Sequence, residues 1–395
     1  MGINHLCPVA GTLPVKIVYF IDHLRPDGTQ KMLTQLVSGM AERGYQQSVV
    51  CLNDSWDDNI VNLLRNTGSE VRIVGKPALL LGFGLLSTWL WLRNNHFQAA
   101  ITFLFASDVV GRTLARLAGI PRIVTSIQAR NTNYAQWQRW LVRKTMPWAD
   151  IVEICSEQQR DFVIEEEGAD PDQICLIHHS IRVEDYVHPV NKVAFRNKYG
   201  LGDEVYIIGS VGRLFPQKGY DVLLSAFEML NLENVHLLIA GTGDELATLE
   251  GLTVDLGIKE RVHFLGHLRD VPNFLRGIDL YVQASRFEGM SIAMLEAMAS
   301  KCPIVATAVD GARELIHDGE HGWLVPTEDP KALAKAIEYA YTNPLDAKQC
   351  AIRARQRVEE QFSVEDMILS WEALISDNGN YISTTNINKN SDDYI

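Results

Sequence analysis

The chain has 395 residues, of which 47% are hydrophobic and 22% charged, a composition typical of soluble globular proteins that excludes disordered, collagenous and coiled-coil classes. At about 150 residues per domain, this length predicts two or three domains. The formal net charge of −13 argues against a protein that coats nucleic acid, because such a protein needs a basic face.

The first half alternates short apolar runs with helical patterns. Val15–Ile21 is typical of a buried parallel strand, and Met32–Met40 has the period of a helix, which Gly44 closes. Further strands are predicted at Gln47–Leu52, Val71–Val74, Ala99–Phe105 and Arg122–Ile127. Such alternation predicts right-handed βαβ crossovers and one doubly wound, Rossmann-like parallel sheet.

A second alternation follows a polar, irregular stretch near Tyr186–Gly202. Its predicted strands are Val205–Val211, Val235–Ala240, Val262–Leu265, Leu280–Gln283, Ile304–Thr307 and Gly322–Val325. Its predicted helices are Gly219–Leu230, Asp244–Leu256, Ser291–Ala299, Pro330–Tyr341 and Asp346–Phe362. We therefore expect a second doubly wound domain, with ligands beyond the carboxyl ends of the strands and a cleft between the two sheets.

The six cysteines are scattered without a C-x-x-C pair, so we predict reduced thiols. Residues 1–14 lack a basic segment followed by an apolar one, which predicts no secretory signal and a cytoplasmic location. The most apolar run, Ala78–Leu92, is shorter than the roughly 20 residues that span a bilayer. No transmembrane helix is predicted.

The loop after the strand at Val205–Val211 carries two cations. Gly212-Arg213 ends the strand, and Lys218-Gly219 leads into the next helix. A guanidinium and an ammonium at the mouth of a sheet suit a diphosphate. Two surface cations near a turn would look the same in sequence, so this motif alone does not decide between the alternatives.

A second motif places two carboxylates eight residues apart across a strand-to-helix turn. Glu288 lies in the loop, Gly289 lets backbone N–H groups approach a ligand, and Ser291 is the expected N-cap. Glu296 stands within an apolar helical run, where a buried carboxylate needs a partner. It could accept both hydroxyls of a ribose, while Glu288 could hold sugar hydroxyls.

The order of these motifs resembles the retaining glycosyltransferases of family 4, which have the GT-B fold. The resemblance is specific from about Gly209 to Pro326 and looser over nearly the whole chain. It rests on Gly-Arg at 212–213, Gln-Lys-Gly at 217–219, Leu-Ile-Ala-Gly-Thr-Gly at 238–243, Phe-Leu-Gly at 264–266, Ser-Arg-Phe-Glu-Gly-Met-Ser at 285–291, Leu-Glu-Ala-Met-Ala at 295–299 and Gly-Trp-Leu-Val-Pro at 322–326.

The resemblance implies a role for each matching residue. Arg213 and Lys218 with Gly212 would grip the diphosphate of a nucleotide-sugar, and Glu296 its ribose. Glu288 would act on the transferred sugar, and the remaining donor contacts would come from Gly289, Met290, Ser291, the base-contacting Leu268 and Arg269, and the glycine-rich loop at Gly28 and Thr29. Apart from these matches, the candidate residues of the acceptor side are Asp108, Gln128 and Arg130.

The same resemblance implies the domain plan. We expect an acceptor-side domain at 1–187, a linker at 188–202 and a nucleotide-sugar domain at 203–362. A crossover helix at 363–376 would return to the first domain. The polar tail at 377–395 is predicted to be disordered.

Two segments depart from the family. Many relatives end the fifth strand with a His near the reacting sugar, where this chain has Gln128, which cannot act as a general base. Gln128 and Arg130 could contact donor or acceptor, or be ordinary polar residues at a strand end. The family's Pro-Asn-Gly-Ile-Asp hinge reads His-His-Ser-Ile-Arg at 178–182, which favours hinge structure over a metal pair because successive residues face opposite sides.

No metal or other cofactor is expected. Asp170-Pro171-Asp172 lies in an acidic turn before a strand, where a solvated loop is the better interpretation than a Mg²⁺ site. Fixed cations and a helix dipole could stabilise the leaving diphosphate instead. We therefore predict a metal-independent hexosyltransferase.

A basic stretch at Val109–Ala149 has seven cations and no Asp or Glu, interleaved with Trp137, Trp140 and Trp148. It favours peripheral binding to an anionic leaflet, with Trp89 and Trp91 as a second contact. The alternative is that these tryptophans pack in the core.

The leading hypothesis is a retaining glycosyltransferase of cell-surface polysaccharide or lipopolysaccharide biosynthesis at the inner face of the plasma membrane. Its donor is a nucleotide-sugar, with UDP as the leading nucleotide, and its acceptor is a lipid-linked glycan. Alternatives are a soluble acceptor or a non-catalytic nucleotide-sugar-binding protein. The sequence specifies neither the sugar nor the linkage.

Overall fold

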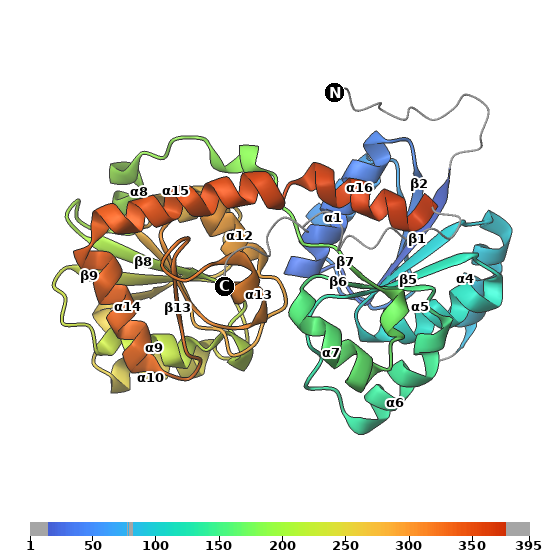
Figure 1. Cartoon of the computed structure of the whole chain (residues 1–395), viewed down its shortest axis with the longest axis horizontal. Coiled ribbons are helices and arrows are strands. Elements are labelled where there is room, and N and C mark those ends of the chain that lie inside the picture. The colour runs from blue at the N-terminus through green and yellow to red at the C-terminus, as the bar shows by residue number, and fades with distance from the viewer. Residues whose placement is uncertain (1–14, 77, 79–81, 377–395) are drawn as a thin grey trace, which may run out of the picture. The chain divides into compact units, whose positions relative to one another are not determined.

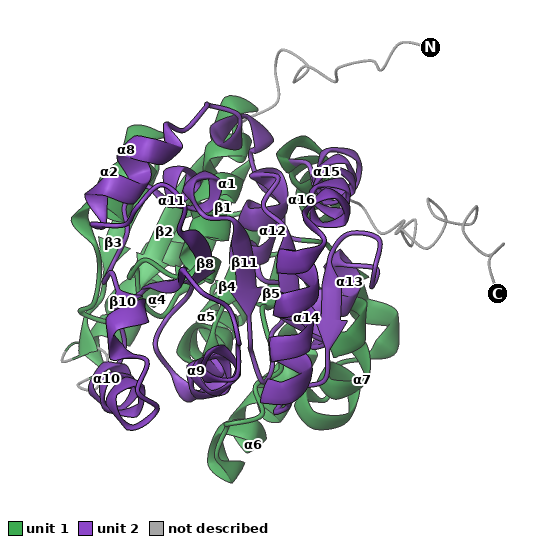
Figure 2. Cartoon of the chain, turned by 90° about the vertical axis from the view of Figure 1, so that its left-hand side faces the viewer, with its two compact units in different colours: residues 1–178, 364–395 green, residues 179–363 purple. Residues whose placement is uncertain are grey.

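The computed structural model describes residues 15–76, 78 and 82–376. The chain divides into two compact units (Figure 2): unit 1 comprises residues 1–178 and 364–395, and unit 2 comprises residues 179–363. The predicted disorder of the tail at 377–395 and the absence of a signal in residues 1–14 concern segments outside the described residues.

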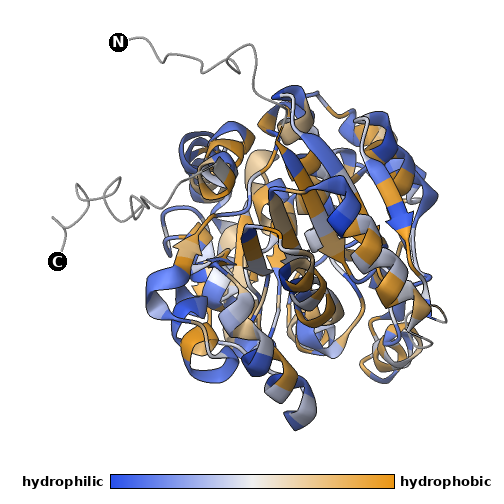
Figure 3. Ribbon diagram, turned by 90° about the vertical axis from the view of Figure 1, so that its right-hand side faces the viewer, coloured by the Kyte–Doolittle hydropathy of each residue, from blue (hydrophilic) through white to orange (hydrophobic). Residues whose placement is uncertain are grey.

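Unit 1 is built on a seven-stranded sheet in the order β3-β2-β1-β4-β5-β6-β7, and all its pairings are parallel (Figure 1). Buried on both faces, such strands are continuous apolar runs, as the orange sheet of Figure 3 shows. The strands are β1 (Lys16–Ile21), β2 (Gln46–Cys51), β3 (Glu70–Ile73), β4 (Ala99–Phe103), β5 (Arg122–Ile127), β6 (Ile151–Ile154) and β7 (Ile174–Leu176).

Helices cover this sheet, and the last helix of the described chain returns to it. α16 (Val364–Ser376) packs against α1 (Gly28–Glu42), and the ring centres of Trp371 and Phe103 lie 6.4 Å apart. The return of the C-terminal helix to the first domain is therefore confirmed. The other main helices of unit 1 are α2 (Asp58–Asn66), α4 (Phe83–Asn95), α5 (Phe105–Ala118), α6 (Gln136–Thr145) and α7 (Arg160–Phe162), which a π-helical turn at Val163–Glu167 extends.

Unit 2 is a second parallel sheet, in the order β10-β9-β8-β11-β12-β13. Its strands are β8 (Tyr206–Val211), β9 (Val235–Ala240), β10 (Val262–Phe264), β11 (Leu280–Gln283), β12 (Ile304–Thr307) and β13 (Trp323–Val325). Its helices are α8 (Lys192–Lys198), α9 (Tyr220–Glu228), α10 (Leu246–Asp255), α11 (Val271–Gly277), α12 (Ile292–Ala299), α13 (Asp310–Leu315), α14 (Pro330–Thr342) and α15 (Pro344–Gln361). The prediction of two doubly wound Rossmann-like domains is confirmed.

Two details differ from the sequence analysis. β6 was not predicted, because Glu153 interrupts its short apolar run. Residues 179–187 belong to unit 2, and the stretch expected as a linker contains α8, which packs on α11. No helix within the described ranges combines the length and apolarity required to cross a bilayer.

Candidate functional site

In unit 2 the direction of strand order reverses between β8 and β11, because β9 and β10 extend the sheet on one side and β12 and β13 on the other. Ligands of doubly wound sheets bind at such a switch point, beyond the carboxyl ends of the strands. The loops that leave β8 and β11 carry the two motifs that the sequence singled out, at 212–219 and 284–291. The fold thus brings both motifs to the expected binding edge.

Lys218 and Glu288 form an ion pair between these two loops, with side chains 18% and 10% exposed. Lys218 is the last residue of a short 3-10 turn (Pro216–Lys218), and Gly219 follows with φ +61°. A Cβ at this position would lie 2.1 Å from the carbonyl oxygen of Ala284. The contact between loops forces this glycine. Arg213 is exposed, and its guanidinium lies 5.0 Å from the centre of the Phe215 ring.

The loops are also joined by hydrogen bonds. Arg286 N–H donates to the Gln217 carbonyl at 2.8 Å, and Gln217 Nε2 donates to the Phe287 carbonyl at 3.0 Å. The Ser285 hydroxyl donates to Glu288 Oε1 at 2.9 Å. Glu288 is thus a fixed, mostly buried carboxylate beside an ammonium.

Gly289, Met290 and Ser291 are buried and lead directly into α12. Ser291 is the N-cap, accepting from Met294 N–H as predicted, and its own hydroxyl donates to Gln283 at 2.7 Å. The helix N-terminus therefore points its amides at the binding edge, which favours an anion there.

Glu296 lies on α12 and is 5% exposed. The hydroxyl of Tyr186 donates to its Oε1 at 2.8 Å. The partner that a buried carboxylate requires is thus supplied by the segment that precedes α8, outside both motifs.

Leu268 and Arg269 follow β10 at the same edge of the sheet. Leu268 is half-buried and Arg269 is exposed. Their contact with a base stays a prediction.

Unit 1 has its own switch point, between β1 and β4. Gly28 and Thr29 are the first two residues of α1, which starts at this edge. Gln30 is fully buried and anchors the turn by donating to the His23 carbonyl at 2.8 Å. Asp22 spans the switch point, accepting from Ser107 N–H at 2.7 Å and Ala106 N–H at 3.1 Å, so it caps α5.

Asp108, expected on the acceptor side, is 3% exposed. It accepts from the Thr102 hydroxyl at 2.7 Å, and burial, opposed by the charge of Arg112, raises its pKa to about 8. A carboxyl enclosed in this way can hold the base of α5 in place. Asp108 is thus about as deeply buried in its unit as Glu296 is in unit 2, and its contact with an acceptor stays a prediction.

Gln128 and Arg130 lie just beyond the carboxyl end of β5 and are half-buried. Gln128 Nε2 donates to the Ser126 hydroxyl at 2.6 Å, and Ser126 in turn donates to Glu153. Arg130 donates to the Gln158 carbonyl at 2.5 Å. Gln128 is thus linked through Ser126 to the buried acid Glu153, and its contact with donor or acceptor stays a prediction.

Two family models match the chain in succession. Residues 26–185 match Glycosyltransferase Family 4, and residues 191–357 match Glycosyl transferases group 1. The chain belongs to the family 4 glycosyltransferases. The two units with the returning α16 are the domains of its GT-B fold.

This glycosyltransferase is similar to proteins of bacterial polysaccharide synthesis. It is 25% identical over 331 residues to the Escherichia coli UDP-Gal:alpha-D-GlcNAc-diphosphoundecaprenol alpha-1,3-galactosyltransferase, covering 77% of this chain and 85% of that one. It is 33% identical to the lipopolysaccharide core biosynthesis glycosyltransferase LpsE of Rhizobium meliloti, but only over 170 residues, 43% of this chain and 49% of that protein.

Among solved structures, Anabaena Alr3699/HepE in complex with UDP and glucose superposes with a TM-score of 0.82. The match covers 92% of this chain and 99% of that chain at 20% identity. At this identity the likeness concerns the fold.

Three polar features beside the predicted site residues were absent from the sequence analysis: Tyr186, Asp22 and the Ser126–Glu153 pair. Asp22 had a signal, because an Asp directly after a buried strand lies at the ligand edge. Tyr186 and the Ser126–Glu153 pair depend on contacts between segments that are distant in sequence. No pattern in the sequence marks such contacts.

Glu153 yields a prediction about pH. It is 1% exposed, and burial, opposed by the Ser126 hydrogen bond, raises its pKa from the ordinary 4.5 to about 8. Between these two values the folded chain holds a proton that the unfolded chain has lost, so stability falls as pH rises. The unfolding free energy of Glu153→Gln should therefore rise relative to that of the wild type from pH 5 to 8. Above pH 8 the difference should stay constant.

Urea denaturation at pH 5 to 9 measures this difference. Glu70→Gln, at an exposed position of the same sheet, is the control and should show no such trend. A Glu153→Gln difference that stays constant with pH would show that Glu153 is ionised in the folded chain.

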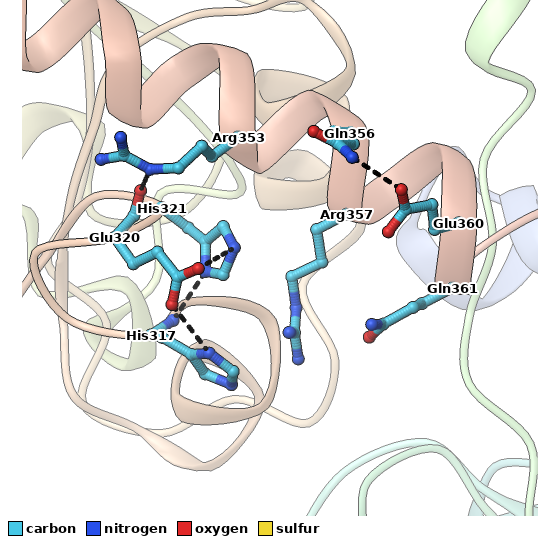
Figure 4. A pocket seen from close by; sticks show the side chains of 8 residues that line it. All are labelled: His317, Glu320, His321, Arg353, Gln356, Arg357, Glu360 and Gln361. Carbon is cyan, nitrogen blue, oxygen red and sulfur yellow. Dashed lines mark hydrogen bonds and ion pairs between the residues drawn. The ribbon is translucent and has the colours of Figure 1, made fainter. Parts of the chain in front are cut away.

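A second polar cluster lines a pocket of about 260 Å³ in unit 2 (Figure 4). His317, Glu320 and His321 bring their nitrogen and oxygen atoms within 4.8 Å of one another. However, His321 Nδ1 accepts from the backbone N–H of His317 at 3.2 Å, which leaves the proton on the Nε2 that faces Glu320. Arg353 and Arg357 also line the pocket. A neutral imidazole donating toward Glu320 fits this arrangement better than a metal ligand, and we assign no metal here.

Proposed function

We propose that this glycosyltransferase moves a hexose from a nucleotide-sugar to a lipid-linked glycan, with retention of anomeric configuration and without a metal. Unit 2 would hold the donor, and unit 1 would carry the acceptor side. The observation that carries the proposal is the junction of the two loops at the switch point of unit 2, where Lys218, Glu288 and the N-terminus of α12 converge.

The charges at this junction suit a leaving diphosphate. Lys218 and Arg213 supply two positive groups, and α12 adds backbone amides and the positive end of its dipole. Glu288 balances the charge of Lys218. A bound diphosphate would share Lys218 and leave Glu288 to accept sugar hydroxyls.

In the proposed reaction the bond between the anomeric carbon and the diphosphate oxygen breaks, and both electrons leave with the diphosphate. An acceptor hydroxyl forms the new bond on the same face of the sugar. Its proton goes to the departing phosphate oxygen, since Gln128 cannot take it. The protein's contribution is to stabilise the charge that develops on the leaving group.

A nucleotide screen tests the donor. UDP at 100 times its Kd should raise the stability of the chain by about 2.7 kcal/mol, because it binds only the folded state. Thermal shift with UDP, GDP, ADP and dTDP reads this out, and the solved neighbour with UDP makes UDP the first choice. Lys335→Met, on the exposed face of α14, is the control and should shift like the wild type. No shift with any of the four would contradict the proposal.

The acceptor proposal rests on the surface of unit 1. Trp137 and Trp140 on α6 are 61% and 58% exposed, so the core interpretation is wrong for these two. Lys144 lies 6.0 Å from the Trp140 ring, and together these three residues are named the α6 patch. Trp89 and Trp91 pack on the core instead, while α4 exposes Phe83, Leu86 and Leu90.

An exposed pair of tryptophans beside cations is suited to an anionic lipid surface, with the rings at headgroup depth. Arg139 and Arg143 hold the turn at Val163–Glu167 through Glu166 and the Glu165 carbonyl, so substituting them would also disturb the fold. The α6 patch can be removed with less damage.

We expect the Trp137→Ala/Trp140→Ala/Lys144→Ala variant to lose most of its binding to vesicles that contain anionic phospholipid. Vesicle flotation measures this, and Lys331→Ala/Lys335→Ala on α14 is the matched surface control. Wild-type binding should weaken with salt, since the charge attraction is screened. If the wild type ignores anionic vesicles, the acceptor is better sought among soluble glycans.

A further inference from the structure

The first residues of unit 2, His179 to Tyr186, contact the motif that runs from Glu288 to Glu296 at two places. This stretch, named the 179–186 segment, includes four of the five residues at 178–182 that depart from the family's usual hinge sequence. It lies more than 100 residues from the motif along the chain. Its two contacts fall on Met290 and Glu296.

The first contact is made by His179, which is 5% exposed. Its ring Nδ1 lies 3.1 Å from the carbonyl oxygen of Met290, and its backbone N–H lies 3.1 Å from the Met290 sulfur. A carbonyl only accepts, so Nδ1 carries the proton and donates. The loop between Glu288 and α12 is thereby held from outside.

The second contact is made by Tyr186 at the end of a 3-10 turn (Val183–Tyr186) that packs on α11 and α12. Tyr186 is 4% exposed, and its hydroxyl donates to Glu296 at 2.8 Å. Burial, together with the charge of Glu296, raises the pKa of this hydroxyl far above its usual range, so it stays a donor at physiological pH.

We propose that His179 and Tyr186 are positioning residues of the donor site: His179 sets the loop at Met290 that faces the sugar and phosphate, and Tyr186 fixes the Glu296 carboxylate that binds the ribose. The inference rests on the proposed function. A carboxylate oxygen that already accepts from Tyr186 cannot rotate freely. Glu296 would then meet the ribose diol in one orientation, without an ordering cost on binding.

Tyr186→Phe removes one oxygen atom and keeps the ring. We expect UDP to bind about tenfold more weakly, since hydrogen bonds to charged groups are the strong ones. The loss should depend on the ribose: the wild type should prefer UDP to 2′-deoxy-UDP, and Tyr186→Phe should lose much of that preference. Weakening both ligands equally would instead indicate a merely structural role.

Tyr339→Phe is the matched control, because Tyr339 also donates its hydroxyl to a carboxylate, Asp346, at 3.0 Å. That pair joins α14 to α15 and is exposed. Titration calorimetry should give the control wild-type affinities for both nucleotides.

His179 has its own pair of variants. His179→Leu removes the donor to Met290, whereas His179→Asn keeps an amide N–H near the position of Nδ1. We expect His179→Leu to lower kcat for donor hydrolysis about tenfold or more, and His179→Asn to restore most of it at unchanged melting temperature.

The outcomes separate the two proposals. If the wild type binds none of the four nucleotides, the proposed function fails and the inference with it. If the wild type binds UDP and both Tyr186→Phe and His179→Leu behave as the wild type, the inference alone is overturned. Should Tyr186→Phe not fold, the two His179 variants decide.

Discussion

Arg213→Met and Lys218→Met are each expected to slow sugar transfer by about a hundred- to a thousandfold, the usual cost of removing one fixed group that stabilises developing charge. The loss should fall mainly on kcat, because the negative charge on the diphosphate grows as the anomeric bond breaks. The rate is measured as donor hydrolysis without acceptor, with the released nucleoside diphosphate as the readout.

Lys218 has a second effect, because it is paired with Glu288. Lys218→Met leaves Glu288 as a carboxylate that is 10% exposed and still accepts from the Ser285 hydroxyl, and a buried charge without an opposite charge beside it is costly. Adding Glu288→Gln to Lys218→Met should therefore restore stability without restoring activity. The two substitutions should be strongly non-additive, as expected for residues in contact.

Controls must separate charge at the site from charge in general. Lys335→Met makes the same change on the exposed surface of α14 and should leave the rate unchanged. Melting temperatures of Arg213→Met and the wild type should agree within a degree or two, since Arg213 is exposed. A rate loss below about threefold for both variants would contradict the proposal that the diphosphate binds at this edge of the sheet.

The fold, and the meeting of the two motifs at the switch point of unit 2, could be predicted largely from the sequence. Strand-and-helix alternation has a strong period, and it locates the switch point of unit 2 once the strands are in order. The residues at that point, Lys218 and Glu288, are brought together by local loops. Short-range signals thus suffice for the part of the site that follows directly from β8 and β11.

The remaining features depend on packing between distant segments. Tyr186 reaches Glu296 across 110 residues, and β6 carries the buried acid Glu153, so no apolar run marks that strand. Asp108 has the residue type expected of a binding group, and the structure buries it as deeply as it buries Glu296. Residue type alone does not distinguish a carboxyl that binds a ligand from one that supports the fold.

Trp371→Ala is expected to lower the unfolding free energy of the chain by about 3–5 kcal/mol, the cost of truncating a large buried aromatic side chain. Trp371 is 1% exposed and anchors α16 to unit 1, where Arg43 also pairs with Glu365 and Glu372. Urea denaturation measures the loss, and amide hydrogen exchange should show faster exchange throughout Val364–Ser376.

Leu369→Ala is the matched control, because Leu369 is on the same helix but 48% exposed, and it should cost well under half as much. The proposed donor site lies in unit 2, so Trp371→Ala should bind UDP as tightly as the wild type under conditions in which both are folded. A small loss of stability with unchanged exchange would show that the ion pairs of Arg43, rather than the burial of Trp371, hold α16. A loss of UDP affinity in the folded variant would show that α16, which belongs to unit 1, also supports UDP binding.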